Sequence, residues 1–123
     1  MTGPKIVLDM KKLLEIEQQV PGRAAQVVQK IAQDCTALIA ENWNSQQPSP
    51  PGEPPGVDTG ALKNSVIAEP GDGALTWVVH DGVEYGVHLE YGAGDMAARP
   101  WLLPAVEETA RMIPPDLLKE VVE

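Results

Sequence analysis

Two histidines and two carboxylates in the second half of the chain are the residues best suited to chemistry. They are His80, Asp81, His88 and Glu90, and such groups bind zinc or act as general acids and bases. A strand would place His88 and Glu90 on one face, because they are two positions apart. A tight turn at Asp81–Gly82 would place His80 on the other face. Since catalytic zinc needs three protein ligands, we expect no metal site and no cofactor.

Other catalytic patterns are also weak. Ser65 has no neighbouring base in the sequence. Asp58-Thr59-Gly60 is not followed by the Lys-Ser/Thr pair of a phosphate-binding loop. Helix capping explains this tripeptide better. The sequence therefore predicts a protein that is not an enzyme.

The bulk composition predicts one soluble domain. The chain has 123 residues and a formal net charge of −9, which opposes tight binding of DNA phosphates. The single Cys35 lies in an apolar helical stripe, so packing explains it better than chemistry. No secretion signal or membrane-spanning apolar run is visible. We therefore expect a cytoplasmic protein, at least during its synthesis, and no membrane partner.

The N-terminal half should be mostly helical. In segment 1–20, a short edge strand at Lys5–Leu8 precedes a helix capped by Asp9, and Pro21-Gly22 ends that helix. A long helix is predicted at 22–44. Its apolar residues recur every three or four positions: Ala24, Val27, Val28, Ile31, Cys35, Leu38, Ile39 and Trp43.

Segment 45–57 is rich in proline and should be extended. Two interpretations stand: a spacer, or an arm that docks on a neighbouring subunit. The arm would present its prolines as interface residues, among them Pro50, Pro51, Pro54 and Pro55.

Segment 58–113 should form a sheet followed by a C-terminal helix. We expect strands at Ser65–Glu69 and Leu75–His80 and a third that begins at Val83. Strand alternation places Thr76, Val78 and His80 on one face, with Tyr85, Leu89 and Tyr91, and this face should pack on the long helix. The opposite face carries Leu75, Trp77, Val79, His88 and Glu90. It is either a subunit interface or covered by the C-terminal segment.

In the last third of the chain, a turn at Pro100 and Trp101 should lead into a helix. Glu90 and Arg99 could form an ion pair that fixes the approach to Pro100 and Trp101. Pro104 should begin a helix that runs to about Met112. In the tail, 114–123, Asp116 should cap a last short turn. The whole chain, 1–123, is thus predicted to be one α+β domain, with a small antiparallel sheet of about three to four strands packed on the long helix.

Three groups of residues, taken in order, resemble the tail-component family of long-tailed bacteriophages and prophages. The similarity spans about residues 24–112. Its residues are Pro51, Asp58, Thr59, Gly60, Leu62 and Ser65; then Tyr85, Glu90 and Gly92; then Arg99, Pro100, Trp101 and Pro104.

The resemblance implies a structural virion protein of the neck or tail region, made in the host cytoplasm. It implies a ring of identical subunits that contacts neighbouring connector and tail proteins, with DNA only as passing cargo. The subrole stays open between neck protein, tail-completion protein and tail terminator. An alternative from another class is a small enzyme or metal-binding protein that uses His88 and Glu90.

Overall fold

The computed structural model describes residues 4–42, 66–73, 75–81, 90–92, 98 and 100–122. Within them the four strands form two separate antiparallel pairs, β1–β4 and β2–β3. The elements in chain order are β1 (Lys5–Leu8), α1 (Met10–Gln19), α2 (Arg23–Glu41), β2 (Val66–Pro70), β3 (Trp77–Asp81), α5 (Leu103–Met112) and β4 (Leu118–Val122).

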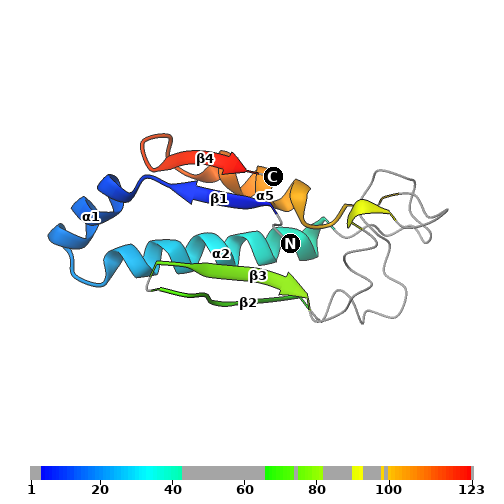
Figure 1. The fold of residues 1–123 in the computed structure, drawn as a ribbon, viewed down its shortest axis with the longest axis horizontal. Helices are drawn as coiled ribbons and strands as arrows, with labels where there is room; N and C mark the ends of the chain where they lie inside the picture. Colours follow the sequence, from blue (N-terminus) through cyan, green and yellow to red (C-terminus); the bar gives the residue numbers. More distant parts are fainter. Residues whose placement is uncertain are drawn as a thin grey trace.

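Helix α2 forms the middle of the fold (Figure 1). The hairpin β2–β3 packs on one side of it, and β1, β4 and α5 lie on the other. The α+β class is therefore confirmed. The single sheet of three to four strands is replaced, in the described part of the chain, by two two-stranded sheets on opposite sides of α2.

Two apolar clusters join these layers. One contains Cys35, Ile39, Trp101, Ala105 and Val106, all buried. The other contains Leu13, Ala24, Val28, Ile113 and Leu117. Each cluster combines residues of α2 with residues from the C-terminal third, so the predicted apolar stripe of the long helix is the centre of the core.

Carboxylates from different parts of the chain cap the first two helices. The side chain of Asp9 accepts the N–H of Lys12 at 3.2 Å, as predicted for the start of α1. Helix α2 starts after Gly22, whose φ of 86° favours glycine and which offers no side chain for capping. Glu17 of α1 supplies the acceptor instead, because its carboxylate accepts the N–H groups of Gly22 at 2.9 Å and Ala24 at 3.3 Å.

The C-terminal tail differs from the prediction. Asp116 does not cap a helical turn. The chain turns at Pro114–Leu117 and continues as β4, antiparallel to β1, with Lys5 opposite Val122 and Leu8 opposite Leu118. Asp116 instead forms an ion pair with Lys12 of α1 at 3.2 Å. The apolar residues of the tail have the spacing of a helical face, but pairing with β1, from the other end of the sequence, makes this segment a strand.

Candidate functional site

The carboxylate of Glu90 lies at the N-terminus of α5, and the residue is 8% exposed. Its Oε1 accepts the backbone N–H groups of Trp101 at 2.8 Å and Leu102 at 2.7 Å. Its Oε2 accepts the N–H of Leu103 at 3.1 Å. These N–H groups begin the helix and have no partner within it, and the positive end of the helix dipole favours a carboxylate there. The N-cap residue Leu102 has no side chain able to do this.

The residues around Glu90 form a corner between two segments of the chain. Gly92 follows Glu90 with a φ of 80°, a conformation that favours glycine at the end of a helical turn. On the other side, Trp101 is buried against Cys35 and Ile39 of α2. Helix α5 has Pro104 in its first turn, as predicted, and starts one residue earlier, at Leu103. This corner therefore fixes how α5 packs on α2.

The structure corrects two expectations at this corner. Glu90 and Tyr91 are helical, so they do not continue a strand, and Tyr91 is 54% exposed instead of packing on the long helix. Glu90 acts on the backbone of α5, a role that the sequence did not indicate because the partners are N–H groups that every residue carries. Arg99, the predicted partner, lies outside the described residues.

The two faces of β3 are reversed relative to the prediction. Alternation is as expected, but the side chains of Leu75, Trp77 and Val79 pack into the two core clusters. Val78 is 43% exposed and points away from α2. This face is therefore covered within the chain, by α2 together with residues of the C-terminal third, which agrees with the alternative to a subunit interface. The error arose because both faces carry apolar residues, so hydrophobic alternation could not choose between them.

On the outward face, His80 and Glu69 form a pair that the sequence reading missed. The imidazole Nε2 and the Glu69 carboxylate are 2.8 Å apart across the β2–β3 hairpin. Ile67 lies opposite His80, and Val78 lies opposite Glu69. Ile67, Glu69, Val78 and His80 thus form the outer face of the hairpin.

Several predicted site residues lie outside the described part of the chain, so their predicted roles stay predictions. They are Pro50, Pro51, Pro54, Pro55, Asp58, Thr59, Gly60, Leu62, Ser65, Tyr85, His88 and Arg99.

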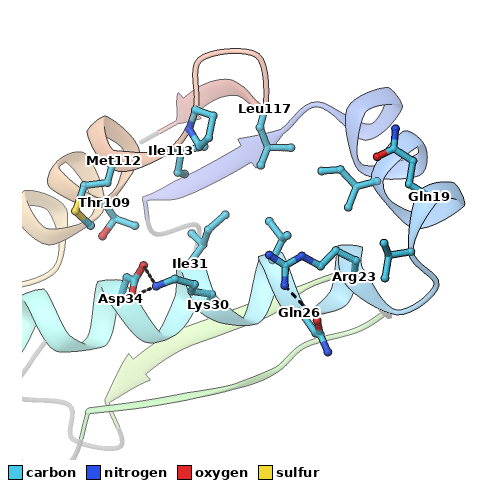
Figure 2. Close-up of a pocket in the computed structure, with 14 residues that line it drawn as sticks. Gln19, Arg23, Gln26, Lys30, Ile31, Asp34, Thr109, Met112, Ile113 and Leu117 are labelled. Carbon is cyan, nitrogen blue, oxygen red and sulfur yellow. Dashed lines mark hydrogen bonds and ion pairs between the residues drawn. The ribbon is translucent and has the colours of Figure 1, made fainter.

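A groove of about 500 Å³ lies between α1, α2 and the end of α5 (Figure 2). We call it the α1–α2–α5 groove. Its floor and walls are mainly apolar, and Arg23, Gln26, Lys30 and Asp34 of α2 line its polar side. The apolar lining residues are Ile16, Val20, Val27, Ile31, Met112, Ile113, Pro114 and Leu117.

The groove was not predicted. Its sequence signal is a pair of apolar residues at helix ends near prolines: Val20, the C-cap of α1 before Pro21, and Met112, the last residue of α5, two positions before Pro114. Both stay more than half exposed, at 55% and 56%. Because both side chains lie along the same mainly apolar groove, together with its lining they form a surface that can receive a partner.

The single thiol is not part of a reactive site. Cys35 is 4% exposed, and burial raises its pKa above the ordinary value, while a hydrogen bond with Thr109 lowers it in part. A protonated, buried thiol is a poor nucleophile. Among the described residues, no group of three or more His, Cys, Asp or Glu side chains is placed to hold a metal ion. No described helix is long and apolar enough to span a bilayer.

Comparison with known protein families identifies the family to which the chain belongs. Residues 10–92 match the model of the HK97-gp10-like family, described as "Bacteriophage HK97-gp10, putative tail-component". This match covers more than half of the sequence. The chain belongs to this family. No curated protein and no solved structure matched it.

The range matched by the HK97-gp10-like family differs from the range of the resemblance. It starts earlier, at Met10, and ends at Gly92. Pro100, Trp101 and Pro104 therefore lie beyond it. The hydrogen bonds of Glu90 connect this last segment to the family region, so the family's final matched residues position the C-terminal helix.

Proposed function

We propose that this HK97-gp10-like protein acts at the junction between the phage head and the tail, as a ring of identical subunits that contacts adjoining connector and tail proteins. The observation that carries the proposal is the family match over residues 10–92. A phage tail component has a structural role in the virion, and ring assembly is the finer role proposed here.

The contacts of Glu90 favour a structural role over the enzymatic alternative. Both carboxylate oxygens of Glu90 are engaged by backbone N–H groups of α5. A general base or metal ligand needs an oxygen available to its substrate or ion. In an enzyme using His88 and Glu90, the substrate or ion would compete with three backbone N–H groups for this carboxylate. Changing both residues to alanine would abolish activity under that alternative.

The charge of the protein fits DNA as passing cargo. With a formal net charge of −9, a ring of copies repels phosphates and lets DNA pass without tight binding. The proline-rich arm at 45–57 is the second part of the proposal, as a segment that docks on a neighbouring subunit. Deleting Gln47 to Pro55 should impair joining and leave the monomer folded, and normal joining after the deletion would contradict the arm.

Electron microscopy of phage particles produced without this chain tests the junction role. We expect full heads and finished tails that remain separate. Tails of abnormal length would instead favour the tail-terminator subrole. Complete virions in normal number would contradict both.

A further inference from the structure

We infer that the α1–α2–α5 groove of one copy binds the outer face of the β2–β3 hairpin of the next copy, with Arg23 of the groove facing Glu69 of the hairpin. This inference deepens the proposed ring and rests on it. A ring needs two unlike surfaces on each subunit that fit each other.

The positions of the two surfaces allow both to be used at once. The hairpin packs on one side of α2, while the groove opens between α2 and the α1 and α5 elements (Figures 1 and 2). Since the surfaces do not overlap, one copy can bind a neighbour through its groove and another through its hairpin. Such head-to-tail contacts close into a ring when the rotation between copies permits.

The apolar parts of the two surfaces match in character. The groove offers Val20 and Met112, exposed by 55% and 56%, above a mainly apolar floor. The hairpin offers Ile67 and Val78, exposed by 44% and 43%. Covering these side chains removes apolar surface from water on both copies, which favours association.

Opposite charges on the groove and the hairpin should determine which surface binds and in which orientation. Copies with a formal net charge of −9 repel each other, so a contact that places a cation against a carboxylate is favoured over other contacts. Lys30 is already paired with Asp34 at 3.2 Å. Arg23 donates only to the side-chain oxygen of Gln26, at 3.4 Å, and no described carboxylate forms an ion pair with it. The side chain of Glu69 is 54% exposed even with His80 beside it.

Cross-linking is the appropriate measurement, because it captures contacts between copies even where a single contact is weak. Specific stable interfaces bury about 1,200–2,000 Å² in total, and closure of a ring adds the effect of many linked contacts. Met112→Cys and Val78→Cys place one exposed thiol on each surface, and the buried Cys35 is protected. The purified full chain is treated with a short bis-maleimide, with the unsubstituted chain as the control for Cys35.

The positions of the two thiols determine which cross-linked products each variant can form. The chain with both substitutions should form a ladder of dimers, trimers and larger species. A mixture of the two singly substituted chains should give dimers only, and each alone should stay monomeric. A doubly substituted chain without a ladder would overturn the inference, as would equal dimer formation by either single variant, since that result means a symmetric contact.

Charge reversal in the doubly thiolated chain tests the proposed ion pair. Arg23→Glu or Glu69→Arg alone should lower the ladder yield about tenfold or more, because like charges then meet. Combining both reversals in one chain should restore the yield. Both sites are exposed, and Glu is favourable in the first turn of a helix, so circular dichroism should show an unchanged fold. Failure of the combined variant to recover would overturn the pairing.

The two proposals can fail separately. Phage that lack the chain and still join heads to tails, together with a clear ladder, would contradict the junction role alone. Unjoined heads and tails without a ladder would retain the junction role and place the ring contacts on other surfaces.

Discussion

The carboxylate of Glu90 lies 2.7 Å from the backbone nitrogen of Leu102, twelve residues further along the chain. This contact and its two neighbours make the N-terminus of α5 depend on a residue outside the helix. The helix then carries Ala105, Val106 and Thr109 into the core, all 5% exposed or less. The buried Glu90 side chain and the packing of these residues on α2 together set the position of the last helix.

Removing the Glu90 carboxylate should destabilise the protein substantially. Glu90→Ala leaves three N–H groups at a buried helix start without their partner, and we expect a loss of about 2–4 kcal/mol in the free energy of unfolding. Glu90→Gln keeps one acceptor oxygen and should lose less. Urea denaturation measures both. Glu107→Ala, at an exposed position of the same helix, is the matched control and should change stability by less than about 0.5 kcal/mol.

A side chain at position 22 should lower the free energy of unfolding, and the backbone conformation at this position should determine by how much. A Cβ built on Gly22 meets nothing within 4 Å, so any loss comes from its φ of 86°. We expect Gly22→Ala to lose about 1 kcal/mol and Gly22→Asn to lose less, because asparagine adopts this conformation more readily. Thermal or urea unfolding of the two variants compares them directly. Equal losses would mean that conformation is not the cause.

The adjacent valines of β3 test the orientation of the hairpin. Val79 packs into the core and Val78 is 43% exposed. We expect Val79→Ala to lower the free energy of unfolding by about 1–2 kcal/mol and Val78→Ala by less than about 0.5 kcal/mol. The two substitutions are chemically identical, so each controls for the other. The opposite order would restore the orientation predicted from the sequence.

Stability should fall in alkaline solution because of Cys35. Burial raises the pKa of the folded thiol, whereas the unfolded thiol keeps a value near 9.0. The stabilising contribution is therefore complete below pH 9.0 and is lost as the pH rises from there toward the folded pKa, by at most about 1.4 kcal/mol per pH unit. Urea unfolding at pH 8 and pH 10 should show a steeper loss for the unsubstituted chain than for Cys35→Ala. Parallel losses in the two proteins would contradict this.

Local signals in the sequence were sufficient to predict those helices whose bounds depend on neighbouring residues alone. Asp9, Pro21 and Gly22 gave the start and end of α1, and the apolar spacing gave α2, predicted at 22–44 and found at Arg23–Glu41. The same periodicity describes the buried side of α5 and its C-cap, since Ala105, Val106, Thr109, Ala110 and Ile113 are all buried. Capping and helical periodicity act within a few residues, so they can be read directly.

Features that depend on distant segments could not be read in this way. The pairing of β4 requires β1, and the inward face of β3 requires knowledge of which side α2 covers. The sequence suggested Glu90 as a partner of Arg99, whereas the partners of Glu90 in the structure are backbone N–H groups, which leave no mark in the sequence. The groove combines α1, α2 and the end of α5, and therefore exists only after the helices pack.

The pairing of Lys5–Leu8 with Leu118–Val122 also orders events during synthesis. When β1 leaves the ribosome, its hydrogen-bonding partner is still about a hundred residues from being made. Ile6 and Leu8 pack on core clusters that include residues of α1 and α2, which are made soon after β1, so it is the hydrogen bonds to β4 that form later. The join between the two strands is consequently the last part of this domain to be completed as the chain is translated.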